Sequence, residues 1–355
     1  MLMWKLFHQK HHTGIYNHFK RMNRHKYQEI LEAIKIPDGM PQEDMLEVLK
    51  PLNIALLQMI PERLYKYRSC YDKHISAFEK DELWLSTSDL FNDPFDTLIQ
   101  YDEEKIRSAF DCVLQPDIFD AMLKHIAAGG KMAEPVNHLV DSTEIDDLRV
   151  KAVDALANGR KFMPSEEQMI QLLIQREAYL TLLPKIAQRF SSAVCFSEKI
   201  DSILMWSHYS YNHTGFVLGY DLRPLLLPNE RNVGLYPVIY SDKRYNAEEF
   251  LLYLFGSLMQ LQIKETDKMS SIKLLLYKSL EWQYEQEWRV IKNNTSNLFE
   301  GHSEPITLNP NSIYYGCHIS QDNYQRLHEI ALSKNLEEHF MKLDNASDEY
   351  IMKVE

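Results

Sequence analysis

The stretch SSAVCFSEKIDSILMWSHYSYNHTGFVLGYDL, residues 191–222, decides how the fold is read from the sequence. Its first part, SSAVCFSE, is a short apolar run of the kind that forms a strand. DSILMWSHYS then has the character of a short helix, and Asp201 or Ser202 can cap its N-terminus. TGFVLGYDL returns to strand character. A strand, a short helix and a second strand in direct succession indicate a domain in which helices and strands are mixed.

Further strands are predicted on both sides of this stretch. Upstream, RLYKYRS and DELWLSTS have strand character, and downstream LYPVIYS, EQEWRVI, EPITLN and SIYYGCHI do as well. Helices are expected over about 247–281 and 320–334. The order lacks the regular alternation of strand and helix that a doubly wound fold requires. We therefore expect an α+β fold with a mostly antiparallel or mixed sheet.

The texture of the sequence divides the chain into four parts. Residues 1–60 are expected to be a helical N-terminal extension, and 61–100 together with 190–335 to be the α+β core. Between the two parts of the core, residues 101–189 contain patterns such as EEQMIQLLIQREAYLTLL, which predict a helical insertion. Residues 336–355 are expected to be an acidic tail.

The composition limits the classes of partner. The formal net charge is −12, which disfavours broad nucleic-acid binding but allows a local basic pocket for one phosphorylated ligand. The sequence contains no run of about 20 apolar residues that would cross a membrane, and its start is too polar for a signal peptide. The four cysteines form no CxxC pair, which argues against a zinc ribbon. We expect a protein that folds in a cytosol.

Several common catalytic and cofactor motifs do not occur in the sequence. It has only 11 glycines and contains no GxGxxG, no P-loop, no HExxH and no GxSxG. A metal-dependent nuclease or hydrolase using Asp93, Asp96 and the glutamates remains an alternative, although such spacing arises easily by chance in an acidic chain.

The segment EQEWRVI places two carboxylates close together in a predicted strand. Alternation points Glu285, Glu287 and Arg289 to one face and the residues between them to the other. One interpretation is a structural ion pair between Glu287 and Arg289 or a cross-strand lysine. The other is a carboxylate pair that serves a sugar and stabilises positive charge at its anomeric carbon.

Four segments in this order resemble an uncharacterised bacterial family, domain of unknown function 2971. They are LYKYRS, LWLSTSDLFNDPFD, CFSEKIDSILMWSHYSYNHTGFVLGYD and YEQEWRVI. More distantly, the order is similar to that of ADP-ribosyltransferases, which split NAD and pass ADP-ribose to an acceptor. This resemblance implies an ADP-ribosyltransferase-like sheet core, with NAD as the substrate and no metal.

The resemblance also implies roles for individual residues. Arg68 would contact the phosphates or ribose of NAD, Glu287 would hold the nicotinamide ribose, and Glu285 would orient an acceptor guanidinium. The middle position is filled either by Ser86, in the sequence Ser86–Thr87–Ser88, or by Ser197. The remaining residues expected to line the NAD pocket are Tyr67, Ser88, Asn92, Asp93, Trp206, His208 and Tyr209.

The resemblance thus implies an NAD-consuming transferase that modifies a protein acceptor, with arginine as the expected acceptor side chain. A non-catalytic module that binds a nucleotide or a protein is the main alternative. The predicted location is the cytoplasm, or a host cell reached by a secretion route that needs no signal peptide, as for a toxin or effector.

Overall fold

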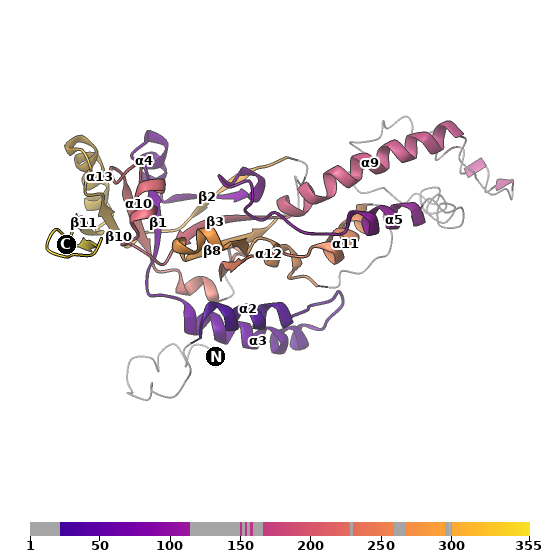
Figure 1. Cartoon of the computed structure of the whole chain (residues 1–355), viewed down its shortest axis with the longest axis horizontal. Coiled ribbons are helices and arrows are strands. Elements are labelled where there is room, and N and C mark those ends of the chain that lie inside the picture. The colour runs from indigo at the N-terminus through magenta and orange to yellow at the C-terminus, as the bar shows by residue number, and fades with distance from the viewer. Residues whose placement is uncertain are drawn as a thin grey trace.

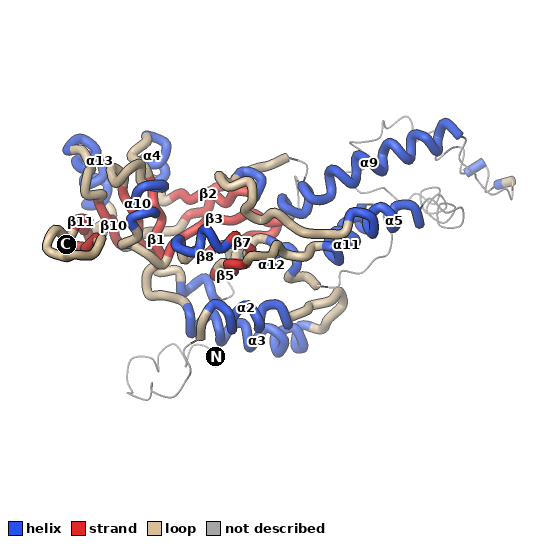
Figure 2. The backbone as a smooth tube through the Cα atoms, viewed as in Figure 1, coloured by secondary structure: helices blue, strands red, loops and turns tan. Residues whose placement is uncertain are grey.

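The computed structural model describes residues 22–113, 150, 153–154, 157–158, 166–227, 230–258, 267–294, 298 and 300–355. Within these residues, ten strands form one sheet (Figures 1 and 2). They are β1 (Leu64–Arg68), β2 (Glu82–Thr87), β3 (Ser191–Ser197), β4 (Phe216–Tyr220), β5 (Gly234–Pro237), β8 (Glu287–Asn293), β9 (Ser303–Thr307), β10 (Ser312–Tyr315), β11 (Glu337–Leu343) and β12 (Met352–Val354). A separate pair consists of β6 (Ile239–Ser241) and β7 (Tyr277–Ser279).

The helices lie around this sheet. The α-helices are α2 (Arg24–Ala33), α3 (Gln42–Met59), α4 (Asp72–Glu79), α5 (Glu103–Val113), α9 (Glu166–Arg189), α10 (Ile203–Tyr209), α11 (Glu248–Leu258), α12 (Ser270–Leu274) and α13 (Gln321–Ser333). Short 3₁₀ helices are η1 (Ser88–Leu90), η2 (Arg223–Leu226) and η3 (Leu280–Glu285). In Figure 1, α2 and α3 lie beneath the sheet, while α5, α9 and α11 extend to one side.

The sheet divides at β3, and this division positions the site. Strand β8 pairs antiparallel with β3 along its whole length, from Ser191 to Ser197. The other edge of β3 is therefore shared by two strands. Strand β2 pairs with the beginning of β3, where Ser86 lies opposite Ala193. Strand β1 pairs with the end of β3, where Tyr65 lies opposite Ser197. Because β1 and β2 take opposite ends of one edge, the middle of β3 is left open between them.

The expected α+β class with a mixed sheet is confirmed. Most strand pairs are antiparallel, but β10 and β11 are parallel, as are β6 and β7, so the sheet is mixed. The chief difference in secondary structure lies over 247–281. One long helix was expected there, whereas the structure contains α11, α12 and strand β7, with residues 259–266 outside the described part.

The chain ends contribute to the core more than the sequence division indicates. Residues 336–355, expected as an acidic tail, contain β11 and β12, because Met341 and Met352 bury their side chains against the sheet. In the expected N-terminal extension, Tyr27 and Leu31 of α2 are fully buried in the main core.

Helices α5, α9 and α11 share a second hydrophobic cluster that includes Phe110. Much of the expected insertion, 114–149 above all, lies outside the described residues.

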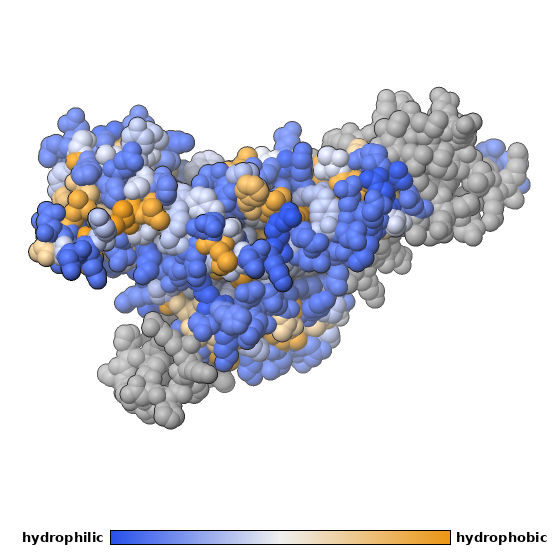
Figure 3. Space-filling view, in the orientation of Figure 1, coloured by the Kyte–Doolittle hydropathy of each residue, from blue (hydrophilic) through white to orange (hydrophobic). Residues whose placement is uncertain are grey.

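One face of the molecule is mainly polar. Hydrophilic residues cover most of the face shown in Figure 3, with scattered hydrophobic ones between them. None of the helices that the structure describes combines the length and the apolar character that crossing a membrane requires.

Candidate functional site

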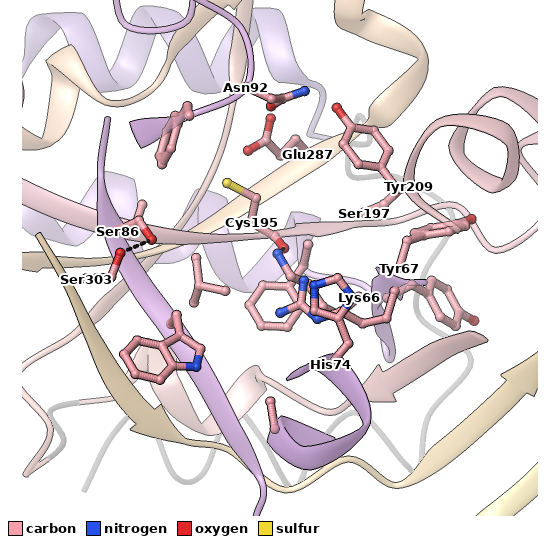
Figure 4. A pocket seen from close by; sticks show the side chains of 18 of the residues that line it. Lys66, Tyr67, His74, Ser86, Asn92, Cys195, Ser197, Tyr209, Glu287 and Ser303 are labelled. Atoms are coloured by element: carbon pink, nitrogen blue, oxygen red, sulfur yellow. Dashed lines mark hydrogen bonds between the residues drawn. The ribbon is translucent and has the colours of Figure 1, made fainter. Parts of the chain in front are cut away.

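A cleft of about 1000 Å³ lies where β1 and β2 diverge from β3. Residues 193–197 of β3 line it together with side chains of β1, β2, α4 and α10. Figure 4 shows Glu287, Asn92 and Tyr209 toward one end, and Lys66 and His74 toward the other. The first group marks a carboxylate-rich end of the cleft and the second a cationic end.

Five charged side chains meet at the carboxylate-rich end. The ammonium Nζ of Lys278 lies 2.6 Å from Oε2 of Glu285 and 2.9 Å from Oε2 of Glu287. Arg289 donates from Nε to Oε1 of Glu287 over 2.7 Å and from a terminal nitrogen to Oδ2 of Asp96 over 2.6 Å. All five residues are buried, and the three carboxylates exceed the two cations by one charge.

The two glutamates reach one ammonium because the chain turns between them. A continuous strand was predicted over 285–291, but Glu285 is the last residue of η3 and β8 begins at Glu287. Gln286 between them adopts the left-handed conformation, with φ of 45°. A residue with positive φ reverses the local direction of the backbone. The two carboxylates therefore approach Lys278 from different elements.

The ion pairs shift the proton affinities of this cluster. Burial raises the pKa of Glu287, but the neighbouring charges of Arg289 and Lys278 outweigh it and hold the pKa well below its usual range. The pKa of Glu285 is raised, first by burial and then by the negative charge of Glu287. Burial lowers the pKa of Lys278, yet the carboxylates around it raise the pKa above the ordinary lysine value. Glu285 is consequently the carboxylate of the pair that takes up a proton more easily.

Strand β3 and helix α10 fix the position of Glu285. The hydroxyl of Tyr209 donates to Oε1 of Glu285 over 2.6 Å. The hydroxyl of Ser197 donates to the Glu285 carbonyl over 2.5 Å and accepts from the backbone N–H of Lys199. Ser197 is thus engaged within the protein, where it fixes the turn that carries Glu285.

The N-terminal helix α2 fixes Glu287 from the opposite side. A terminal nitrogen of Arg24 donates to the carbonyl of Glu287 over 3.0 Å and to that of Val238 over 2.7 Å. The other terminal nitrogen pairs with Glu198, which also accepts from the indole N–H of Trp288. Arg24 therefore connects α2 to the first residue of β8.

The opposite end of the cleft is cationic. Lys66 and Arg68 come from β1, Lys73 from α4, and Lys80 from the residue that follows α4. In the part of the chain that the structure describes, none of the four forms an ion pair. In a chain with a net charge of −12, four such cations at one place are a concentration of positive charge that requires an explanation.

Burial costs Lys66 and Arg68, the two cations of β1, part of their proton affinity. It lowers the pKa of Lys66 to about 8, with a further contribution from the nearby charge of Arg68. Burial also lowers the pKa of Arg68 from its ordinary value. Burial and the charge of Arg68 lower the pKa of His74 to about 4, so its imidazole is neutral at physiological pH. The protein keeps uncompensated positive charge in a partly desolvated place, which an anion would stabilise.

The structure brings most of the predicted site residues to this cleft. Those that line it are Tyr67, Arg68, Ser86, Asn92, Ser197, His208, Tyr209, Glu285 and Glu287. Three others lie elsewhere. Trp206 is fully buried in the core, where its indole N–H donates to the carbonyl of Ile200. Ser88 is buried and donates to the carbonyl of Gln188. Asp93 lines a separate pocket of about 320 Å³.

Sequence reasoning anticipated the ion pair between Glu287 and Arg289 but did not identify Lys278 as the lysine that joins both glutamates. Lys278 stands seven residues before Glu285 and joins the site because η3 folds the chain back, which no periodicity reveals. Cys195 was not among the predicted site residues, yet it lines the cleft beside Glu287. Burial and the charge of Glu287 raise the pKa of its thiol to about 12, so it stays protonated.

The carboxylates are arranged around cations of the protein itself. Among the described residues, no group of three or more His, Cys, Asp or Glu side chains is placed to hold a metal ion. Lys278 and Arg289 occupy the centre on which Asp96, Glu285 and Glu287 converge. Asp93 does not join this group.

Comparison with known proteins gave one result. No curated protein and no solved structure matched the chain significantly. The family model described as "Protein of unknown function (DUF2971)" matched residues 205–290. This region includes Tyr209, Lys278, both glutamates and Arg289, so it carries most of the carboxylate-rich end of the cleft. The expected resemblance to this family is therefore confirmed over residues 205–290, where the chain matches the model of the DUF2971 family of proteins of unknown function.

Proposed function

We propose that the cleft binds NAD and that the protein transfers ADP-ribose from it to an acceptor on another protein. One observation carries this proposal. Cations without ion-pair partners among the described residues line one end of the cleft, and fixed carboxylates line the other. NAD has the same polarity, because its pyrophosphate is anionic and its nicotinamide ribose becomes cationic as the glycosidic bond breaks.

In this proposal each end of the cleft has a chemical task. Arg68 and Lys66 bind the pyrophosphate, for which the planar guanidinium of Arg68 is well suited. Glu287 accepts a hydrogen bond from a hydroxyl of the nicotinamide ribose. As the bond between C1′ and nicotinamide breaks, its electron pair leaves with nicotinamide, and the excess negative charge of the cluster stabilises the cationic sugar.

Glu285 serves the acceptor in this scheme. The nucleophile of the acceptor forms a bond to C1′ and releases a proton, which Glu285 can accept because its pKa is raised. A negatively charged Glu285 would also orient a guanidinium, so arginine is the acceptor side chain that we propose. Nicotinamide and the ADP-ribosylated protein are the products.

The order of the site residues supports the likeness to ADP-ribosyltransferases. Arg68 lies on β1, Ser197 on β3 and Glu287 on β8, and Ser197 is directly opposite Glu287 in the paired strands. We assign Ser197 to the middle position because of this pairing. Ser86, whose hydroxyl bonds to that of Ser303, would line the pocket. An ADP-ribosyltransferase-like core is part of the same proposal.

The first experiment measures NAD binding by titration calorimetry and nicotinamide release on the same samples. Agmatine, a small guanidine, serves as a substitute acceptor. The variants are Arg68→Gln and Glu285→Gln, with Glu47→Gln as a control, since the side chain of Glu47 is 75% exposed and remote from the cleft. We expect Arg68→Gln to weaken binding and Glu285→Gln to reduce transfer to agmatine while binding persists. Absence of NAD binding by the parent protein would refute the proposal.

A non-catalytic nucleotide-binding role is the second candidate, and one observation favours it. Both oxygens of Glu287 are already engaged by Arg289 and Lys278, as in a structural ion pair. NAD binding without nicotinamide release, in the presence of agmatine and of protein acceptors, would support this role instead.

The biological setting follows from the proposed reaction. A bacterial protein that consumes NAD would act as a toxin or effector, either in the cytoplasm of the producing cell or in a host cell. Delivery to a host would use a route that does not depend on a signal peptide.

A further inference from the structure

The cationic end of the cleft contains more positive charge than the pyrophosphate of NAD requires. Each phosphate of NAD carries one negative charge, and Lys66 and Arg68 of β1 can compensate both. Lys73 and Lys80 remain. Both line the cleft, both are exposed, and neither forms an ion pair among the described residues. Glu82 of β2 lines the same end and is likewise without an ion pair in the described chain.

Lys73 lies in helix α4, and Lys80 directly follows the helix at its C-terminal end, on the same side. Lys73, Ser76, Ala77 and Lys80 all line the cleft, and their spacing of three, four and seven residues places them on one side of a helix. A rise of 1.5 Å per residue separates the two lysines by about 10 Å along the axis. The small side chains of Ser76 and Ala77 lie between them, so the face has a cation at each end and open space in the middle.

Strand β2 adds an aromatic surface to the same end of the cleft. Glu82, Trp84 and Ser86 alternate along β2 and all line the cleft. Trp84 is 46% exposed, so a large part of its indole surface is open to a ligand in the cleft. Exposed aromatic side chains beside cations are the typical platform on which nucleobases stack.

We propose that this end of the cleft is an adenosine subsite, and that it selects a dinucleotide with an additional phosphate on the adenosine ribose. The proposal rests on the proposed function of the cleft as a dinucleotide site. Adenine stacks on Trp84, Lys66 and Arg68 bind the pyrophosphate, and Lys73 and Lys80 bind the additional phosphate. NADP, which carries this phosphate at the 2′ position, is therefore the preferred substrate over NAD.

The test compares four ligands on the full chain by titration calorimetry. NADP is compared with NAD, and adenosine 2′,5′-bisphosphate with adenosine 5′-monophosphate. We expect the ligand with the additional phosphate to bind at least about tenfold more tightly in each pair, and the preference to decline with added salt. The double variant Lys73→Gln, Lys80→Gln should bind both members of each pair alike. Lys50→Gln, on an exposed face of α3, is the matched control and should retain the preference.

Trp84 is tested by a pair of substitutions. Trp84→Ala should weaken the binding of adenosine 2′,5′-bisphosphate by about tenfold, which is within the range known for base stacking. Trp84→Phe should bind this ligand almost as tightly as the parent protein does. Equal binding of NAD and NADP to the parent protein would overturn the proposal, and so would a preference that survives the double lysine variant.

These outcomes separate the subsite from the reaction. Binding of adenosine 2′,5′-bisphosphate that depends on Trp84 and the two lysines would support the subsite even if no nicotinamide is released, in which case only the transferase proposal fails. Nicotinamide release with no preference between NAD and NADP would support the transferase and overturn the subsite.

Discussion

The Tyr209 hydroxyl donates a 2.6 Å hydrogen bond to Oε1 of Glu285, although 76 residues separate the two in the chain. Burial and the charge of Glu285 raise the pKa of Tyr209, so its hydroxyl remains a donor at any physiological pH. The conformation of Glu285 thus depends on helix α10 as well as on its own segment. Both residues fall within the region that matches DUF2971.

Substitution of Tyr209 should therefore affect the acceptor step. Tyr209→Phe keeps the ring and leaves Oε1 of Glu285 without its donor, which should cost about 1–2 kcal/mol of unfolding free energy. We expect slower transfer to agmatine with little change in NAD affinity, measured by product formation and by calorimetry. A variant with unchanged transfer would show that the orientation of Glu285 is unimportant to the reaction.

Glu287→Gln should lose nicotinamide release and also part of its stability. The substitution removes one carboxylate from a buried network in which Arg289 and Lys278 depend on it. Removal of one partner from such a pair typically costs about 3–5 kcal/mol. Denaturant unfolding should show this loss, so activity must be measured on samples proven folded by their near-UV circular dichroism. Folded Glu287→Gln that still releases nicotinamide would contradict the proposed role.

Arg68→Gln should have the opposite effect on stability. Arg68 forms no ion pair within the described residues, and burial disfavours its charged form. Its removal should leave the melting temperature unchanged or raise it, while the affinity for NAD falls by about tenfold or more. Such an exchange of stability for binding is common at functional sites. A marked loss of stability would indicate that Arg68 is a structural residue.

Ligand affinity should depend on pH through Lys66. Its pKa is lowered to about 8, so its positive charge, and with it the attraction for phosphate, declines as the pH rises through 8. Titrations between pH 6.5 and 9 should therefore show weaker NAD binding at the alkaline end, and the decline in affinity should have its midpoint at about pH 8. Lys66→Gln should bind weakly throughout and lose this dependence.

The unfolding free energy should rise with pH through the same Lys66, whereas the affinity for NAD falls. A lysine with a lowered folded pKa stabilises the folded state fully above its unfolded pKa, and this contribution disappears as the pH falls through about 8. The parent protein should therefore gain unfolding free energy relative to Lys66→Gln as the pH is raised from about 8 towards 10. A difference independent of pH would indicate that Lys66 is not desolvated.

Local patterns in the sequence were sufficient for the fold class and for the strands nearest the cleft. RLYKYRS, SSAVCFSE and TGFVLGYDL became β1, β3 and β4, because apolar alternation and turn residues act over a few positions. The strand predicted at EQEWRVI begins two residues later than expected, because Gln286 adopts the left-handed conformation. The sequence could not predict this start, because nothing in it distinguishes Gln286 from other glutamines.

The site required information that sequence spacing does not contain. That Glu285 and Glu287 act together was visible in the sequence, but the ammonium of Lys278 between them was not. The resemblance implied that Trp206 lines the pocket, yet its indole turns into the core against Tyr67. Which side of a short helix faces a cleft depends on the strands that pack against it, here β1.

The bond from Arg24 to the carbonyl of Glu287 also sets an order of events during synthesis. The two residues are 263 positions apart, so at roughly 5–20 residues per second Arg24 waits about 13–50 s on the ribosome before its partner is made. The synthesis of strand β8, which pairs with one whole edge of β3, comes equally late. A nascent chain therefore has the cationic end of its cleft before the carboxylate-rich end, and the proposed reaction can begin only after β8 has been made.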